Sequence, residues 1–460
     1  MRVAIVGGGI AGSAVAMILR RIGVEFTLFE KRSSLVSGPP MCHLHAGGNL
    51  YPDIDDTQRL RLLKESLELM RLFPQAIDYR PTALAVPKND PNDPIHLAKR
   101  AARLQKEYAK LCSQDKANQL LGDPSSYLKS YTYQDLLRLQ AKEQPTRPSC
   151  PDEWMIPFAK EVDLDQLKYP VLLVREFGLN IFRIAATAQI LLDGSDIRLK
   201  SEVLHIQKKN TFHITLRQNG KIVEEEFDYL INAAGFESGK IDDDLGYARE
   251  RFVEFKAAYV TRWQSQYRWP EVIFHGPRGS EQGMGQFTPY AGGYFQLHGM
   301  TPSITLFEDG LAKSAQSAQP RLASSFVQMI EDGWPKDLIY KRTTKAIQHL
   351  ARFIPSFQSA QGGAKPLYGA QQIPGSDATL RAAEVSFEKD YARCEIVKAS
   401  SIVAMAQSIV QEIGYSGSLP IDTPKLDKEI LDQKAQDIAR QRGYPAQMGL
   451  LANATLDECS

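Results

Sequence analysis

Residues 2–32 have the sequence RVAIVGGGIAGSAVAMILRRIGVEFTLFEKR, and this stretch decides the fold. Residues 2–6 form a short apolar run rich in β-branched side chains, which is typical of a buried parallel strand. The run passes directly into GGGIAG at 7–12, which matches G-x-G-x-x-G, and apolar residues then recur at helical spacing. A second strand pattern over 26–29 ends on Glu30. Together these elements predict a βαβ unit with a dinucleotide at its glycine-rich turn.

The three glycines of this pattern have separate physical tasks. Gly7 permits the tight turn after the strand, Gly9 lets the backbone approach a pyrophosphate, and Gly12 lets helix and strand pack closely. The N-terminus of the predicted helix faces the phosphates with unpaired backbone N–H groups, and Ile10 and Ala11 lie within the glycine motif that leads into it. We therefore assign all five residues to cofactor binding.

Glu30 and Lys31 complete the predicted nucleotide site. Glu30 lies 18 positions after Gly12, where an acidic side chain accepts hydrogen bonds from an adenosine ribose. Lys31 follows at the end of the same strand and is assigned to the site with it. A glycine-rich turn alone would be weak evidence. Here the strand, the helix, the second strand and the acid all keep the expected register.

Length and composition are typical of a soluble globular enzyme. The chain has 460 residues, 43% of them hydrophobic and 24% charged, which favours two joined domains. A net charge of +1 gives no electrostatic case for a nucleic acid partner. The five cysteines are scattered without metal-ligand spacing, so we expect reduced thiols and no bound metal. The first strand begins too early for a signal peptide, and no apolar run reaches the ~18 residues of a membrane-spanning helix. We expect a cytoplasmic location.

The rest of the chain returns to a nucleotide-binding pattern after an interruption. A strand pattern at 170–176 and a helical one at 181–192 lead to YLINAAG at 229–235, and strand-type alternation continues over 252–298. Other patterns predict a strand over 195–207 and helices over 57–73, 95–112, 321–332, 342–352 and 396–413. Simple NAD dehydrogenases complete their nucleotide domain within about the first 150 residues. Because this fold breaks after one βαβ unit, we expect FAD rather than NAD.

This interrupted layout resembles the D-amino-acid-oxidase superfamily, which includes glycine oxidase, sarcosine oxidase and malate:quinone-type flavoproteins. The resemblance is carried by GGGIAGSAVAMILRRIGVEFTLFEKR at 7–32, the small-residue loop at 37–48, YLINAAG at 229–235 and the strand run at 252–298. It implies an α/β fold with an interrupted Rossmann-type FAD-binding domain and a second, mostly antiparallel β-sheet plus helix substrate domain. It also implies that Ala234 and Gly235 contact FAD. The segment 366–396 departs from the superfamily, because the glycine-rich turn expected before the last helix is missing.

The resemblance and the element pattern together predict the domain boundaries. The FAD-binding domain is expected to be discontinuous, with residues 1–80, 170–250 and 355–415. Residues 81–169 are expected to form a helical and irregular insertion, and 251–354 the substrate domain. The charged, loosely helical tail at 416–460 is not expected to carry chemistry.

His43 and His45 are the first candidates for catalysis, because the resemblance puts their loop beside the flavin. Residues two apart on an extended loop point to the same side. The pair would touch the isoalloxazine, act as an acid or base, or carry the flavin covalently. The alternative is a polar pair hydrogen-bonded to the backbone. For the neighbouring Cys42, a buried inert thiol is the favoured interpretation.

Tyr294 and His298 are the second pair of candidates. With Gln296 they fall on one face of the strand predicted over 293–298. A face that mixes aromatic and hydrogen-bonding side chains suits the wall of a flavin site. The competing interpretation is an antiparallel sheet with one wet face and a structural His298.

A substrate carboxylate would need an arginine clamp, and Arg381 is the preferred candidate because it follows a proline–glycine turn in the segment expected near the flavin. Three other arginines are weaker candidates, since a single arginine is more often a surface ion-pair partner: Arg80, Arg183 and Arg262. Lys256 is expected to be a solvated strand lysine, with water-mediated contact to flavin N5 as the alternative.

The predicted function is a FAD-dependent oxidoreductase, an oxidase or a dehydrogenase. It would take a hydride from the carbon that bears an amine or hydroxyl in a small carboxylate substrate. The electrons would pass to O2, a quinone or a protein acceptor. The alternatives are a FAD-dependent monooxygenase or halogenase, and a non-catalytic FAD-binding protein. The basic face of the helix at 95–112 leaves peripheral membrane contact open, although a solvated face is favoured.

Overall fold

The apolar run at the start of the chain becomes the centre of a six-stranded sheet in the computed structural model, which describes residues 1–37, 44–46, 55–381 and 383–453. β1 (Val3–Val6) pairs in parallel with β2 (Phe26–Glu30) on one side and with β13 (Tyr229–Asn232) on the other. The strand order is β21-β22-β13-β1-β2-β9, and β21 runs antiparallel to its neighbour. The remaining members are β9 (Asp196–Leu199), β21 (Val385–Glu388) and β22 (Tyr391–Cys394).

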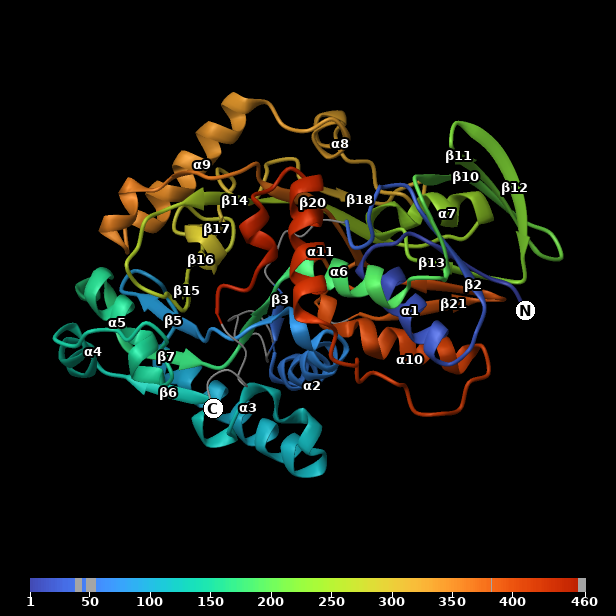
Figure 1. Cartoon of the computed structure of the whole chain (residues 1–460). Coiled ribbons are helices and arrows are strands. Elements are labelled where there is room, and N and C mark those ends of the chain that lie inside the picture. The colour runs from blue at the N-terminus through green and yellow to red at the C-terminus, as the bar shows by residue number, and fades with distance from the viewer. Residues whose placement is uncertain (38–43, 47–54, 382, 454–460) are drawn as a thin grey trace.

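Both faces of the six-stranded sheet are covered, as parallel strands require. On one face, Val3 and Ile5 pack in the core that also contains α1 (Ile10–Arg21), and two further helices pack against α1 (Figure 1). These helices are α6 (Ile181–Leu191) and α10 (Ile402–Glu412). On the other face, Ala4 and Val6 pack against a three-stranded antiparallel sheet. Its strands are β10 (Ser201–Lys208), β11 (Phe212–Gln218) and β12 (Lys221–Phe227).

A ten-stranded, mostly antiparallel sheet forms the second large unit, and its longest strand is β14 (Arg251–Arg262). The main order is β18-β14-β17-β16-β15-β5-β7-β6, and β19 and β20 also pair with β14. The other strands are β5 (Thr82–Pro87), β6 (Leu128–Tyr131), β7 (Leu167–Val174), β15 (Glu271–Phe274), β16 (Gly285–Tyr290), β17 (Tyr294–Gly299), β18 (Leu311–Lys313), β19 (Gln361–Gly362) and β20 (Leu367–Pro374). One face of this sheet packs against three helices: α4 (Tyr133–Gln140), α5 (Pro151–Glu161) and α9 (Lys336–Ala351).

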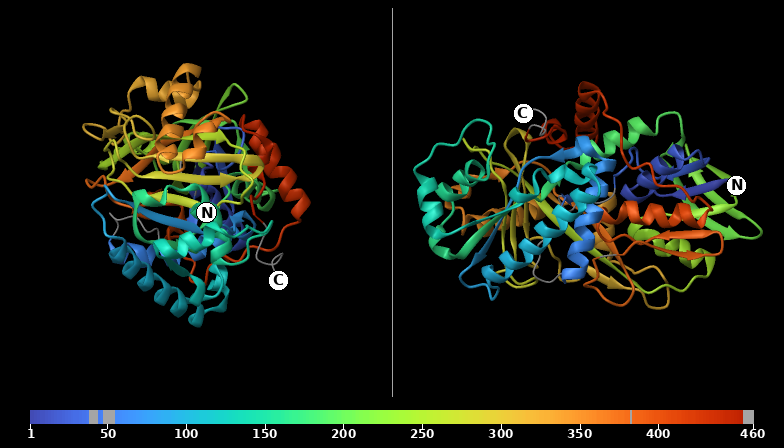
Figure 2. Two further views of the ribbon diagram at one scale, coloured as in Figure 1. Left: turned by 90° about the vertical axis from the view of Figure 1, so that its left-hand side faces the viewer. Right: turned by 90° about the horizontal axis from the view of Figure 1, so that it is seen from below.

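The two large sheets occupy opposite ends of an elongated molecule, with α2 (Asp56–Leu72) between them, as the right-hand view of Figure 2 shows. A small sheet of β3 (Leu44–Ala46), β8 (Phe177–Leu179) and β4 (Ile77–Asp78) completes the strands. The remaining helices are α3 (Pro94–Gln114), α7 (Ser238–Leu245), α8 (Ser324–Glu331) and α11 (Lys428–Gln441). Among the helices of the described residues, none combines the length and the apolar character needed to cross a membrane.

The segment 81–169, which was expected to be a helical and irregular insertion, also contains strands. It contains α3, α4 and α5, but it also supplies β5 and β6 to the ten-stranded sheet. β5 pairs in parallel with β15, which lies almost two hundred positions further along the chain. Short apolar runs such as that of β5 give no periodicity that identifies a strand or its partner, so the sequence pattern missed this pairing.

The continuous strand predicted over 195–207 is also wrong. The chain breaks at Lys200, whose φ of +53° is in the left-handed region. This bend sends β9 into the six-stranded sheet and β10 into the three-stranded one. The helix predicted over 396–413 likewise begins later, at Ile402.

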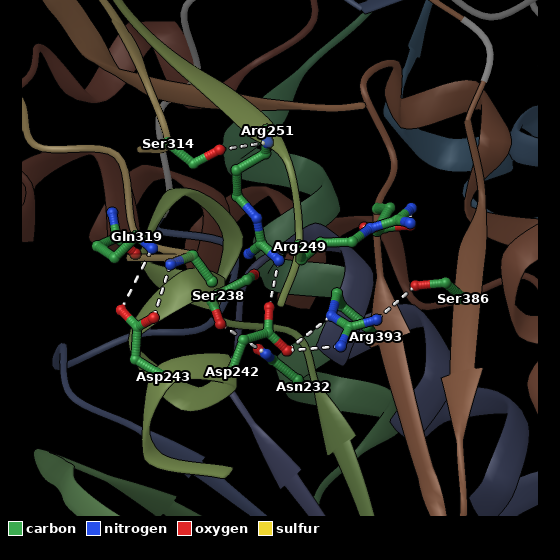
Figure 3. Close-up of polar contacts among 12 residues, drawn as sticks. Asn232, Ser238, Asp242, Asp243, Arg249, Arg251, Ser314, Gln319, Ser386 and Arg393 are labelled. Atoms are coloured by element: carbon green, nitrogen blue, oxygen red, sulfur yellow. Dashed lines mark hydrogen bonds and ion pairs between the residues drawn. The ribbon is translucent and has the colours of Figure 1, made fainter. Parts of the chain in front are cut away.

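A buried ion-pair cluster around Asp242 ties the two large sheets together (Figure 3). Asp242 lies on α7, accepts hydrogen bonds from Arg393 Nε at 2.7 Å and Tyr391 Oη at 2.8 Å, and forms an ion pair with Arg251. Arg393 and Tyr391 belong to β22, whereas Arg251 begins β14. The three charged residues are at most 1% exposed, so the carboxylate of Asp242 offsets two guanidinium groups in this interior.

We expect Asp242→Asn to lower the free energy of unfolding by about 3–5 kcal/mol, because the amide leaves two buried arginines without a counter-charge. Urea unfolding followed by circular dichroism measures the change. The control is Asp437→Asn, which removes an exposed ion pair with Arg440 and should cost at most about 1 kcal/mol. Equal effects of the two substitutions would contradict this role of Asp242.

His349 is a buried neutral histidine on α9. Its Nε2 lies 2.9 Å from the carbonyl oxygen of Gly283, and Arg352 Nη2 donates to its Nδ1 at 2.7 Å. A carbonyl only accepts and a guanidinium only donates, so the proton is on Nε2 and Nδ1 is an acceptor. Burial, together with the charge of Arg352, lowers the pKa of His349 from 6.5 to about 4.

This shift predicts a loss of stability in acid. The pKa is lower in the folded chain, so the contribution of His349 is complete above pH 6.5 and is lost as the pH falls through about 4. At about 1.4 kcal/mol per pKa unit, the loss is about 3 kcal/mol between pH 7 and pH 4. Urea unfolding at both pH values should give a smaller pH effect, by that amount, for His349→Gln than for the wild type. Identical pH effects would contradict the prediction.

Candidate active site

A cavity of about 1120 Å³ is lined by residues of both the six-stranded and the ten-stranded sheet. This volume exceeds the ~300–1,000 Å³ typical of small-molecule sites. Its wall includes the glycine-rich turn after β1, the end of β2 and polar side chains of the ten-stranded sheet. The cavity therefore joins the carboxyl ends of parallel strands, where α/β sheets bind ligands, to a second, chemically different wall.

The glycine-rich turn has the geometry of a close backbone approach. Gly7 has φ of +104°, and a Cβ atom there would lie 2.4 Å from the carbonyl oxygen of Ala233. A Cβ atom on Gly12 would lie 1.9 Å from the carbonyl oxygen of Gly7. A Cβ atom on Gly9 would meet nothing within 4 Å, because this residue faces the cavity. These positions suit the steric tasks expected of the three glycines.

The N-terminus of α1 faces the same cavity. Gly9 caps the helix without a side-chain hydrogen bond, and Ile10 and Ala11 line the cavity. The N–H groups of the first helical turn have no intrahelical acceptors, and the helix dipole makes this end attractive to an anion. The turn and the helix end together can hold a diphosphate.

Glu30 lies beside the turn and is buried, with 7% of the residue exposed. It accepts hydrogen bonds from the N–H groups of Gly8 and Arg32, each at 2.7 Å. Burial raises the pKa of Glu30, against the opposing effect of these two hydrogen bonds. A carboxylate has about four acceptor positions, so capacity remains for ribose hydroxyls. Lys31 lines the cavity and forms an ion pair with Glu237.

The adenosine end of the predicted site is lined by small and apolar residues. Ala234 and Gly235 follow β13 and line the cavity, and Val203 and Leu204 approach from β10. These residues can contact the adenine ring, Glu30 can accept hydrogen bonds from the ribose hydroxyls, and the glycine turn can hold the diphosphate. The residues present therefore fit FAD, although contact of each one with the cofactor stays a prediction.

The ten-stranded sheet presents a polar wall to the other end of the cavity. Lys256, Gln286 and His298 come from β14, β16 and β17, line the cavity and are at most 6% exposed. Lys256 Nζ lies 2.5 Å from Glu254 Oε2 and 3.3 Å from Gln371 Oε1. The expectation of a solvated lysine is therefore wrong, because Lys256 is buried beside a carboxylate of its own strand.

His298 is held in one orientation by two side chains. Its Nε2 lies 3.0 Å from the amide nitrogen of Gln296, and its Nδ1 lies 3.3 Å from the hydroxyl of Thr305. An amide nitrogen only donates, so Nε2 is an acceptor and the ring is neutral with its proton on Nδ1. Gln286 is the cross-strand partner of His298 and donates to Glu271 at 2.6 Å.

Tyr294 does not join His298 at the cavity. It begins β17, four residues away, and Arg262 lies over its ring with 5.8 Å between guanidinium and centroid. At ~3.3 Å per residue, the two positions are about 13 Å apart along the strand. The alternation of side chains along the strand predicted that Tyr294 and His298 share one face, but it could not predict that the cavity ends before Tyr294.

The first pair of histidines lies largely outside what the structure describes. His43 falls outside the described residues. His45 belongs to β3, where its backbone pairs with Gly178. Their catalytic or flavin-contacting roles therefore stay predictions.

Of the four candidate arginines, which are all described, Arg381 alone lines the cavity. Its Nη1 donates to the carbonyl oxygens of Leu380 at 2.7 Å and Ala378 at 3.1 Å. The other three have different partners: Arg80 with Asp78 and Glu271, Arg183 with Asp432, and Arg262 with Tyr294.

The cavity also contains residues that sequence reasoning missed. Arg278 lines it and pairs with Glu254, and His275 lies nearby at 3% exposure. The C-terminal tail, which was not expected to carry chemistry, contributes Arg442 and Tyr444. The sequence offered one signal for the tail: apolar residues at helical spacing in α11, which predict packing but not a partner.

Comparisons with known proteins agree with this geometry. Residues 2–136 match the family model of the FAD dependent oxidoreductase. No curated protein sequence matches the chain. Among solved structures, glycine oxidase from Geobacillus kaustophilus is similar with a TM-score of 0.58 and 12% identity, over 93% of this chain and 100% of that one.

Two other solved structures share the fold over similar lengths. L-proline dehydrogenase from P. horikoshii has a TM-score of 0.57 and 14% identity, over 96% of this chain and 98% of its own. L-alpha-glycerophosphate oxidase from Mycoplasma pneumoniae, solved with FAD bound, has a TM-score of 0.57 and 15% identity, over 92% and 99% of the two chains. At these identities the structures show the fold, whereas the family match covers the dinucleotide-binding residues. Residues 2–136 therefore match the FAD dependent oxidoreductase family, and the chain as a whole shares the fold of these flavin enzymes.

Proposed function

We propose that the chain oxidises the C–H bond next to an amine or hydroxyl group of a small, anionic substrate. The observation that carries this proposal is the continuity of one cavity from the glycine turn at Gly9 to the polar wall at Lys256, Gln286 and His298. When bound, FAD supplies a two-electron acceptor for a hydride. The protein residues must then orient the substrate, hold its charge and accept one proton.

The charges at the polar wall favour a substrate with a carboxylate or similar anion. Lys256 and Arg278 both pair with the carboxylate of Glu254 at this wall, and Arg381 lines the same cavity. Cations therefore outnumber this anion, and an arginine fork and a lysine together suit a planar carboxylate. Glycine oxidase and the L-amino acid deaminase from Proteus vulgaris, which share the fold, are named for carboxylate substrates.

We assign His298 as the base that accepts the proton from the substrate. It is neutral, it lies in the cavity wall, and its contact with Thr305 fixes the orientation of the ring. Catalytic hydrogen bonds are often incomplete before substrate binds, so the present contact of Nε2 with Gln296 does not oppose this role. Lys256 then holds the substrate anion beside the base.

Anaerobic titration of the purified, FAD-loaded protein tests the proposed reaction. With a panel of small amino acids and hydroxy acids, we expect at least one to bleach the flavin absorbance directly, without NADPH. Loss of absorbance only with NADPH, and NADPH-stimulated O2 consumption, would point to the monooxygenase alternative. Tight FAD binding without reduction by any donor would support the non-catalytic alternative. Re-oxidation of the bleached protein by O2 or by a quinone then identifies the acceptor.

His298→Asn should lower kcat for the substrate so found by about a hundredfold or more, because general acid–base catalysis contributes ~10²–10⁴. Its affinity for FAD should stay unchanged, which separates lost proton transfer from a damaged cofactor site. Tyr294→Phe is the matched control on the same strand and should keep kcat within about twofold. Loss of activity in Tyr294→Phe but not in His298→Asn would reverse the assignment.

A further inference from the structure

Three cationic side chains meet at the dinucleotide end of the cavity, and they come from distant parts of the chain. Arg32 follows β2, Lys365 precedes β20, and Arg442 directly follows α11 in the C-terminal tail. All three line the same cavity as Gly9 and Ile10. The oxidation proposed above uses none of them.

Arg442 is anchored on the loop that follows Glu30. Its Nε and Nη2 donate to the hydroxyl of Ser34 at 3.2 and 3.1 Å, and Nη2 also donates to the carbonyl oxygen of Leu35 at 2.6 Å. The loop itself packs on the glycine turn, since the N–H of Val36 donates to the carbonyl oxygen of Gly8 at 2.7 Å. Nη1 of Arg442 is buried and has no hydrogen-bond acceptor among the described residues. One nitrogen of the guanidinium group is therefore left without a hydrogen-bond partner among the described residues.

The charges of this cationic group are not offset by ion pairs. Within the part of the chain that the structure describes, none of the three forms an ion pair with a carboxylate. Arg32 donates to the carbonyl oxygen of Ile330 at 3.3 Å, and Lys365 Nζ lies 4.9 Å from the ring centroid of Tyr444. Glu30 attracts Arg442 through space without pairing with it.

The neighbouring arginines act electrostatically on Lys365. Burial, and then the charges of Arg442 and Arg32, lower the pKa of Lys365. Burial also lowers the pKa of Arg442 to about 10. Like charges in one partly desolvated wall are unfavourable until an anion binds between them.

We propose that Arg32, Lys365 and Arg442 bind the diphosphate of FAD, so that the C-terminal tail closes the dinucleotide end of the cavity. A diphosphate brings two negative charges to the turn at Gly9, which lines the same cavity as these three side chains. The N-terminus of α1 supplies only a partial positive charge, and arginine forks bind phosphate oxygens with two parallel hydrogen bonds. The proposal rests on FAD as the cofactor and is independent of which substrate is oxidised.

The tail is fixed to the body of the protein on both sides of α11. Before the helix, Asp422 accepts two hydrogen bonds from Arg71, each at 2.7 Å. Within the helix, Asp432 pairs with Arg183, and after it the hydroxyl of Tyr444 donates to the carbonyl oxygen of Pro366 at 2.8 Å. These contacts hold Arg442 in the cavity wall. If FAD binds to Arg442, FAD binding should in turn stabilise the packing of the tail on the body of the protein.

The test compares the flavin-free wild type with Arg442→Gln and with Arg440→Gln, a control two residues earlier whose exposed ion pair faces away from the cavity wall. Each protein is titrated calorimetrically with FAD, with ADP, which carries the diphosphate, and with adenosine, which lacks it. Arg442→Gln should weaken FAD and ADP binding by about tenfold or more, the typical effect of a lost charged hydrogen bond, and leave adenosine within about twofold. Arg440→Gln should match the wild type.

Two results would overturn the proposal. In one, Arg442→Gln binds ADP as tightly as the wild type. In the other, it loses ADP and adenosine equally, which would make Arg442 a support of the fold alone. If the wild type itself binds neither FAD nor ADP, the proposed function fails as well, so the two failures are distinguishable.

Amide hydrogen exchange of the wild type, measured with and without FAD, tests the proposal independently. FAD should slow amide exchange in α11 and in residues 442–450, because cofactor and tail stabilise each other. This protection should shrink in Arg442→Gln. Exchange in the tail that is the same with and without FAD would also contradict the proposal.

Discussion

Two glycines without side chains set the distance between α1 and the six-stranded sheet, and the rest of the site depends on that distance. A Cβ atom would lie 1.9 Å from a backbone oxygen at Gly12 and 2.4 Å from one at Gly7, so no larger residue fits without moving the helix. The close packing directs the N-terminus of α1 into the cavity, beside the end of β13 and the buried carboxylate of Glu30. The proposed cofactor site, with the glycine turn on one side of it, depends on this contact.

The cavity has cations at both ends, and they are compensated differently. At the polar wall, Lys256 and Arg278 share the carboxylate of Glu254, so one positive charge is in excess and a single extra anion is accommodated. At the dinucleotide end, the three cations Arg32, Lys365 and Arg442 have no such partner among the described residues. A more highly charged group fits that end. This division agrees with a diphosphate cofactor at one end and a small singly charged substrate at the other.

Local features of the chain could be predicted from the sequence, because their causes are local. The glycine turn, α1, the hairpin of β11 and β12, and the strands β14, β16 and β17 follow from periodicity and turn chemistry over a few residues. The pairing of β5 with β15 and the arrival of Arg442 at Ser34, which are 408 positions apart, depend on tertiary contacts that no local pattern records. Lys256 is an intermediate case. Its partner Glu254 lies two residues earlier on the same strand face, so a charge pair was visible, but its burial was not.

FAD and substrate are proposed to share one cavity lined by both large sheets, and a crystal structure with FAD and a small carboxylate inhibitor tests this arrangement. We expect the diphosphate at the turn of Gly9, and the inhibitor between the isoalloxazine and the wall formed by Lys256, Gln286 and His298. An inhibitor bound away from that wall, or an isoalloxazine outside this cavity, would rule the arrangement out.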